Sequence, residues 1–113
     1  MNTRCRTIKE EFRKNSEVCE RVVTLLHLIS NKARFRIVCL LSRGGEFCVN
    51  DIMDVVDEGK LSHISQQLMI LRLAGIVQKR RSNKLILYAI KDERVRRLIE
   101  FLCLQYLNKQ HNP

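Results

Sequence analysis

The chain has 113 residues, of which 45% are hydrophobic and 29% charged, and 21 Lys and Arg against 12 Asp and Glu give a formal net charge of +9. This length corresponds to one domain, and no apolar run reaches the roughly 18 residues of a membrane span. Without a secretory signal or a disulfide-type cysteine pattern, the chain is expected to be cytoplasmic and to bind no membrane. The excess of cations makes nucleic acid the first partner to consider, because Lys and Arg displace counterions condensed on a polyanion.

Residues from about Ile8 to Ile29 are predicted to form the first helix. Residues 1–16 are expected to be an N-terminal arm or an extension of that helix. The prediction rests on apolar residues at three- and four-residue spacing, which are Val18, Val22, Leu25, Leu26 and Ile29.

Two short helices punctuated by glycines are predicted next. Asn31 can cap the helix KARFRIVCLL, which should stop at Gly44-Gly45. Another helix should start at Asn50, with Asp51 favourable in its positive first turn, and end at Gly59. Consecutive short helices of this kind indicate a compact helical bundle.

A helix with two distinct faces follows. Leu61, Ile64, Leu68 and Leu71 recur at steps of three and four, which places them on one face, and Gly75 can terminate the helix. The other face presents hydrogen-bonding side chains near its N-terminal end, which are Ser62, His63, Ser65 and Gln66.

The segment IVQKRRSNKLILYAI predicts a β-hairpin with a tight turn around Ser82-Asn83. A polar helix face is by itself more often simply solvated, but a cationic hairpin directly after it favours DNA binding. Such a helix can read base edges in the major groove while the hairpin binds phosphates. The sequence therefore predicts a mainly α-helical winged helix-turn-helix with a small β-hairpin. The predicted contacts on the hairpin are Lys79, Arg80, Arg81, Asn83 and Lys84.

The last helix is predicted around residues 95–107, where apolar residues leave little polar circumference. One small domain cannot cover both sides of such a helix, so we expect a symmetric homodimer that packs through its first and last helices. Two recognition helices would then meet successive major grooves of a near-palindromic double-stranded operator. Residues 1–113 would form one winged-helix domain, with 109–113 as a flexible tail.

No catalytic motif is present in the sequence. It lacks a Gly-rich phosphate loop, an HExxH motif and a recognisable Ser/His/Asp arrangement, so the chain is not predicted to be an enzyme and no cofactor is expected. A competing prediction is a protein-interaction module that holds another protein on its apolar last helix.

Several linked motifs resemble the ArsR/SmtB family of bacterial winged-helix repressors over about residues 17–108. The phrase SNKARFRIVCLL is similar to the family's helix-start phrase. Ser65-Gln66-Gln67-Leu68 and the run LRLAGIV at 71–77 resemble its later motifs, and the wing follows. The resemblance implies a homodimeric DNA-binding transcriptional repressor.

The metal sites of that family look incomplete in this chain. One family site uses Cys-x-Cys, where this sequence has Cys48-Val49-Asn50. The positions that match the second site are Asp92, Arg94, Gln105 and Asn108. Arg cannot be a ligand and amides are poor ones for zinc, so no metal ligand is predicted.

The resemblance is closer to the family's thiol-based branch, which senses persulfides or oxidants and includes virulence regulators. Cys39 matches the first sensing position, whereas the second holds Leu107, with Cys103 four residues earlier. Cys39 and Cys103 are therefore redox-sensing candidates. Cys39 could equally be an apolar packing residue, and for Cys103 the sequence favours packing at an interface. Arg36 and Arg43 would favour the Cys39 thiolate, while its apolar neighbours would oppose it. Alternatives are a constitutive DNA binder or anti-silencer without inducer, or a metal-responsive repressor with an unusual site.

Overall fold

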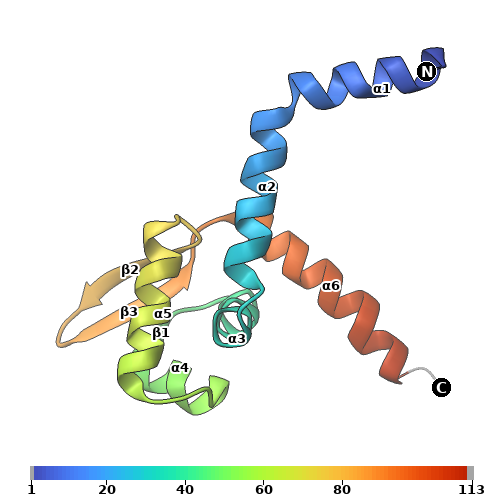
Figure 1. The fold of residues 1–113 in the computed structure, drawn as a ribbon. Coiled ribbons are helices and arrows are strands. Elements are labelled where there is room, and N and C mark those ends of the chain that lie inside the picture. Colours follow the sequence, from blue (N-terminus) through green and yellow to red (C-terminus); the bar gives the residue numbers. More distant parts are fainter. Residues whose placement is uncertain (1, 112–113) are drawn as a thin grey trace. The chain divides into compact units, whose positions relative to one another are not determined.

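The computed structural model describes the backbone of residues 2–111 and the side chains of residues 2–106. The chain divides into two compact units at Ser30, and each is described by itself. No helix within the described residues has the length and apolar character that crossing a membrane requires. The elements in chain order are α1 (Thr3–Lys14), α2 (Ser16–Ile29), α3 (Lys32–Leu41), β1 (Phe47–Cys48), α4 (Val49–Val56), α5 (Leu61–Leu73), β2 (Val77–Ser82), β3 (Leu85–Ile90) and α6 (Glu93–His111) (Figure 1).

The first unit contains two helices where the sequence predicted one. α1 begins at Thr3, where the Asn2 side chain accepts a hydrogen bond from the Cys5 backbone N–H at 2.8 Å. It ends at Asn15, which has φ −104° and ψ 20° and donates from both its backbone N–H and its side-chain amide to the Glu11 carbonyl oxygen. The helix breaks at this residue, and α2 leaves at an angle (Figure 1). Apolar spacing could not show this break, because it continues across Asn15.

The second unit starts with the predicted cap. The Asn31 side chain accepts a hydrogen bond from the Arg34 backbone N–H at 3.0 Å, so Asn31 begins α3 as expected. α3 lies at the centre of this unit and packs against α4, α5, α6 and β3. Its residues Ile37, Val38 and Leu41 are completely buried.

α4 begins one residue earlier and ends earlier than predicted. Its C-terminal residue is followed by Asp57 in the left-handed conformation, with φ 50°, so the helix stops at Val56 rather than at Gly59. Aspartate is among the few non-glycine residues that adopt this conformation. Gly59, with φ 95°, instead shapes the turn that leads into α5.

The end of α5 follows the prediction. Gly75 adopts φ 78°, its N–H bonds the Arg72 carbonyl, and the Ile76 N–H bonds the Leu71 carbonyl, each at 3.0 Å. These two bonds form a Schellman cap, which satisfies carbonyl groups that a helix end otherwise leaves unpaired. The cap turns the chain directly into β2, so α5 and the hairpin pack together.

The sheet has three antiparallel strands in the order β1-β3-β2. The hairpin pairs Ser82 with Leu85, so its turn is Asn83-Lys84, one residue later than predicted, and Asn83 has φ 57°. β1 was not predicted, because two residues carry no alternation that sequence reasoning could detect. It pairs only with residues 87 and 88 of β3. The sheet is therefore three-stranded only in the middle rows of the hairpin, and its tip is two-stranded.

The core of the second unit is formed by apolar side chains from α3, α4, α5, the base of the hairpin and the start of α6. One predicted core residue differs, since Leu61 is 44% exposed at the first position of α5. The largest fully buried side chains are Ile37, Val38, Leu41, Ile52, Val56, Ile64, Leu68, Leu71, Val77, Val95 and Ile99.

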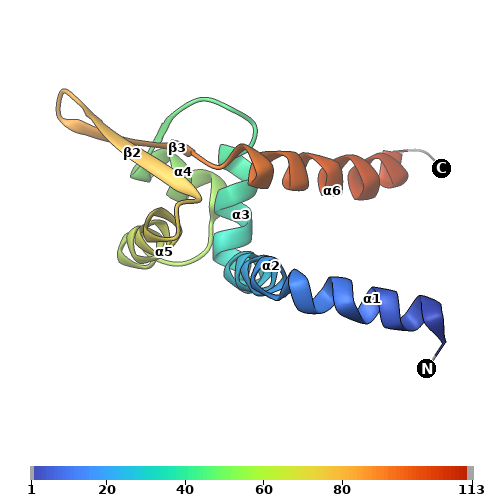
Figure 2. The same ribbon diagram turned by 90° about the horizontal axis from the view of Figure 1, so that it is seen from above.

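α6 has one covered face and one uncovered face. Val95 and Ile99 are buried on one side, whereas Phe101 and Leu104 on the other side are 59% and 58% exposed. Tyr106 lies on the same side as Ile99, nearly two turns later, and is 71% exposed. The helix runs away from the sheet in both views (Figures 1 and 2). α6 continues to His111, so the tail predicted for 109–113 falls on residues whose side chains are not described and, at 112–113, outside the described backbone.

Candidate DNA-binding surface and thiol pocket

α5 separates its polar and apolar side chains as the sequence predicted. The buried Ile64, Leu68 and Leu71 hold the helix on the core. The four predicted base-reading residues are all exposed, and they gather on the first two turns of the helix. They are Ser62, His63, Ser65 and Gln66.

One polar residue of α5 that sequence reasoning passed over is buried. Gln67 is 6% exposed, and its side-chain oxygen accepts a hydrogen bond from the Arg34 guanidinium at 2.7 Å. A charge-assisted bond of this length ties α5 to α3. The signal in the sequence is that Gln67 falls between Ile64 and Leu68 on the apolar side of the helix.

A second polar contact joins α3 to the turn before α5. Glu58 accepts from Arg36 at 3.0 Å and lies 3.2 Å from the Lys32 ammonium. These two cations hold the pKa of the Glu58 carboxyl below its usual value, with the Arg36 hydrogen bond as the largest cause. Together with the Arg34–Gln67 bond, this ion-pair group ties the turn before α5 and the middle of α5 to α3.

Gly59 and His63 meet at the N-terminal end of the polar face. A Cβ atom at position 59 would lie 3.0 Å from His63 Cδ2, and the φ of 95° is one that other residues rarely adopt. We expect Gly59→Ala to cost about 1–2 kcal/mol of unfolding free energy and to displace His63. Chemical denaturation measures the change in unfolding free energy, and DNA affinity reports the displacement of His63.

The matched control is Gly45→Ala. Gly45 also has a positive φ, of 92°, but no atom lies within 4 Å of a Cβ added there. Gly59→Ala should impair DNA binding, whereas Gly45→Ala should affect stability alone, and equal DNA affinities would contradict this role of His63.

The wing carries the predicted cations, and the structure distinguishes among them. Lys79, Arg81 and Lys84 are exposed, and the Arg81 Nε donates to the Asn83 carbonyl at 3.1 Å across the turn. Arg80 instead makes two hydrogen bonds to Glu46, from Nε at 2.5 Å and from Nη2 at 2.7 Å. This pairing lowers the pKa of the Glu46 carboxyl, chiefly through the hydrogen bond from Arg80.

The two candidate sensing thiols line one pocket between α3 and α6. It has a volume of about 420 Å³, and both Cys39 and Cys103 are half-buried free thiols. The Ser42 hydroxyl nearby is buried and has no hydrogen-bond partner among the described residues, while its carbonyl accepts from Arg96 at 3.1 Å. The pocket is lined by Cys39, Ser42, Arg43, Ile99, Glu100, Cys103 and Leu104.

Burial decides the protonation state of Cys39, which the sequence left open. Loss of solvent raises the pKa of the Cys39 thiol to about 11, and interaction with the Cys103 thiol, including a hydrogen bond, adds to the rise. Arg43 and Arg36 lower it, as their spacing suggested, but do not offset the burial. At neutral pH Cys39 is therefore almost entirely a neutral thiol.

The residues that match the family's metal sites make other contacts. The Cys48 thiol donates to the Asp51 carboxylate at 3.2 Å. Asp92 pairs with Arg94 at 3.1 Å, which lowers the pKa of the Asp92 carboxyl. The described part of the chain has no group of three or more His, Cys, Asp or Glu that could hold a metal ion. The Asn108 side chain lies outside the described residues.

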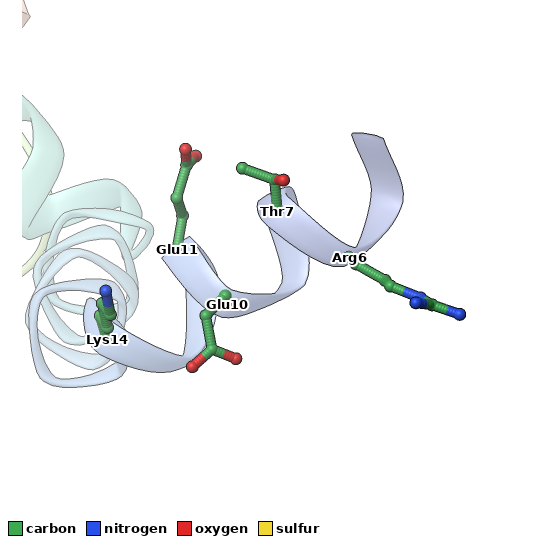
Figure 3. Close-up of a pocket in the computed structure, with 5 residues that line it drawn as sticks. All are labelled: Arg6, Thr7, Glu10, Glu11 and Lys14. Atoms are coloured by element: carbon green, nitrogen blue, oxygen red, sulfur yellow. The ribbon is translucent and has the colours of Figure 1, made fainter. Parts of the chain in front are cut away.

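A hollow along α1 does not form a comparable site. Its lining residues all come from one helix and point in different directions rather than toward a common centre (Figure 3). They are Arg6, Thr7, Glu10, Glu11 and Lys14.

Comparisons with known proteins agree with this geometry. The chain is 36% identical over 91 residues to a biofilm growth-associated repressor of Agrobacterium fabrum, which covers 80% of this chain and 76% of that protein. The crystal structure of the transcriptional repressor BigR from Xylella fastidiosa superposes with a TM-score of 0.72 at 31% identity, over 87% of this chain and 95% of that one. A homodimeric winged helix-turn-helix DNA-binding domain, Mb0332 from Mycobacterium bovis, superposes with a TM-score of 0.69 at 26% identity, over 87% of each chain.

The family assignment rests on both sequence and fold. Residues 31–79 match the model of the bacterial regulatory protein family arsR, and this range runs from the cap of α3 into the wing. It includes every element that positions the exposed polar face of α5. The chain therefore belongs to the ArsR family of bacterial winged helix-turn-helix transcriptional regulators.

Proposed function

We propose that this protein is a transcriptional repressor that binds a near-palindromic operator as a homodimer, with α5 in the major groove and the wing on the phosphates. The observation that carries the proposal is the separation of faces on α5. Its exposed face offers hydrogen-bond donors and acceptors over the first two turns, while its opposite face is anchored in the core. A rigidly held helix of this kind can discriminate base edges, whereas a mobile one cannot.

The homodimer is proposed from α6. Phe101 and Leu104 lie three residues apart and form an uncovered apolar surface, which water-exposed helices of monomeric proteins rarely keep. A symmetric partner would cover it with the same surface, and the homodimeric relative supports this arrangement. Two-fold symmetry then predicts two half-sites about one helical turn of DNA apart.

Selection of bound sequences from random DNA tests the proposal. An enriched inverted repeat is the expected result, and enrichment of no sequence would contradict base reading. Salt separates the alternative of a protein-interaction module: affinity for DNA should fall steeply between about 50 and 200 mM salt, whereas an apolar protein contact should hardly change.

Gln66→Ala tests the base-reading face directly. If Gln66 hydrogen-bonds a base, the variant should lose about 1–3 kcal/mol of binding free energy on the selected operator and little on random DNA. Fluorescence anisotropy with both DNAs measures the difference in one protein preparation. The side chain is exposed and makes none of the core contacts of its neighbour Gln67, so the fold should be retained. An equal loss on both DNAs would assign Gln66 to the phosphates instead.

A thiol-controlled version of this repressor is favoured by the pocket between α3 and α6. Both thiols line it, and α3 is bonded to α5 through Arg34 and Gln67. Peroxide could oxidise one thiol to a sulfenic acid with release of water, and the second thiol would then displace a further water molecule to form a disulfide. That bond would draw α6 and α3 together and shift α5 through the contacts that hold it. A constitutive binder or anti-silencer would show no such response.

A further inference from the structure

The pairing of Arg80 with Glu46 has a consequence for how the wing works. We propose that Arg80 is not a phosphate contact but the anchor of the wing, a positioning residue that fixes the hairpin to the loop before β1 through Glu46. The proposal deepens the DNA-binding function above, on which it rests. It assigns the phosphate contacts to the remaining wing cations, Lys79, Arg81 and Lys84.

Strand alternation places Arg80 on a different face from its neighbours. Val77 and its partner Ile90 are buried, so the face of β2 that carries Val77 also carries Lys79 and Arg81. Arg80 lies on the opposite face. On that face it is paired in register with Leu87, which in turn pairs with Cys48 of β1.

Glu46 shares this second face because it precedes Cys48 by two residues. Its carboxylate reaches across the central strand β3 and receives two hydrogen bonds from the Arg80 guanidinium. Such a two-bond contact fixes orientation as well as distance. The contact therefore joins β2 directly to the residue that precedes β1, on the other side of β3.

The position of this bond along the hairpin explains why an anchor is useful. β1 pairs with β3 only at residues 87 and 88, so the sheet is three-stranded only as far as the row that contains Arg80. Beyond it, residues 81–86 form a two-stranded arm, and isolated two-stranded hairpins are marginally stable in water. The Arg80 end of this bond lies in the last row that β1 still pairs with, next to the two-stranded arm.

Charge supports the same assignment. The Glu46 carboxylate neutralises Arg80 locally, and moving Arg80 onto a phosphate would leave that carboxylate near the DNA without its partner. Such an arrangement opposes binding, whereas the intact pair is neutral toward the polyanion. Within the part of the chain that the structure describes, no carboxylate pairs with Lys79, Arg81 or Lys84, so these cations are free of this conflict.

Arg80→Gln, Arg80→Lys and Glu46→Gln test the anchor without DNA. Lysine keeps the charge but cannot make the two-bond contact. All three variants should therefore exchange the backbone amides of residues 77–90 about two- to fivefold faster, measured by hydrogen exchange and mass spectrometry. Unchanged exchange in Arg80→Gln and Glu46→Gln would overturn the anchor even if the protein binds DNA as proposed.

DNA binding then separates an anchor from a phosphate contact. Arg80→Lys and Arg80→Gln should weaken operator binding to the same extent, about two- to fivefold, with the salt slope retained. In the matched controls Lys79→Gln and Arg81→Gln, the slope should fall by about one unit per lost contact. Arg80→Lys with wild-type affinity, or a slope reduced in Arg80→Gln, would make Arg80 a phosphate contact.

The charge swap Glu46→Arg/Arg80→Glu gives the decisive comparison. An anchor should be restored by the exchanged pair, so both amide protection and operator affinity should return toward wild type. If Arg80 touches phosphate, the charge swap places a carboxylate against DNA, and the double variant should bind DNA more weakly than either single variant. A chain that binds no DNA at all would refute the proposed function. The amide hydrogen-exchange measurements would still decide whether the anchor exists.

Discussion

Replacing Phe101 with glutamate is expected to convert the protein to monomers and to weaken operator binding by at least about a hundredfold. The Phe101 side chain is 59% exposed on α6, beside the equally uncovered Leu104. In a symmetric dimer this face is covered by the partner's α6, and a glutamate there would bury an unpaired carboxylate at a cost of several kcal/mol. A monomer has one recognition helix and loses the effective concentration that links two half-sites, which accounts for the fall in affinity.

Size-exclusion chromatography with light scattering measures the oligomeric state, and anisotropy measures the operator affinity. The matched control is Phe101→Leu, which keeps the apolar character and should remain dimeric. Because Phe101 is not among the buried core residues, the Phe101→Glu monomer should stay folded, as circular dichroism would show. A soluble Phe101→Glu protein that remains fully dimeric would place the interface elsewhere.

α5 and the wing could be predicted because their patterns are local. The spacing of Ile64, Leu68 and Leu71 predicts the buried face of α5, and Gly75 predicts the C-terminal cap that the structure contains. The exposed positions of Ser62 and Gln66 follow from the same period. In the wing, the cations lie on the strands as expected, with the turn displaced by one residue.

What could not be predicted depends on individual polar contacts, most of them between distant segments. Asn15 ends α1 by bonding the Glu11 carbonyl, although the apolar spacing runs on through the break. The Arg80–Glu46 pair joins residues 34 positions apart, and nothing in the composition of the wing distinguishes Arg80 from Lys79 or Arg81. Burial of Gln67 likewise depends on Arg34, which supplies the hydrogen bond that makes a buried amide tolerable.

The Cys39 pKa shows how two opposed sequence signals are resolved by packing. Arg36 and Arg43 both favour the thiolate and lower the pKa of Cys39. Loss of solvent around the thiol raises this pKa by more than the two arginines lower it. Since the pKa of about 11 in the folded protein lies above the ordinary thiol value of 9.0, the neutral thiol is the form that folding favours. The stabilising effect of burying Cys39 is therefore present below pH 9 and is lost as the pH rises through 11.

Thiol modification is expected to depend steeply on pH for the same reason. The thiolate is the reactive form, so the rate of Cys39 modification should rise about tenfold per pH unit between pH 7 and 9. Timed alkylation followed by mass spectrometry measures the rate. The exposed Cys5 and Cys19 serve as internal references on the same chain, because their modification should be faster than that of Cys39 at neutral pH. Equal rates at all sites would show that Cys39 is more accessible than its position in the pocket indicates.

Oxidation of the wild-type protein is expected to weaken operator binding by at least about tenfold, and Cys39→Ser should abolish the response. The two thiols line one pocket, so peroxide should produce a disulfide between α3 and α6, visible as the loss of two hydrogen atoms in the intact mass. Cys103→Ser separates the mechanisms: a disulfide switch needs Cys103, whereas a single-thiol switch does not. The matched control is Cys48→Ser, a half-buried thiol outside the pocket, which should respond like the wild type. If Cys39 remains unmodified in the folded protein and operator affinity is the same before and after treatment, the thiol pair only packs α6 against α3, and repression is constitutive or answers to a different signal.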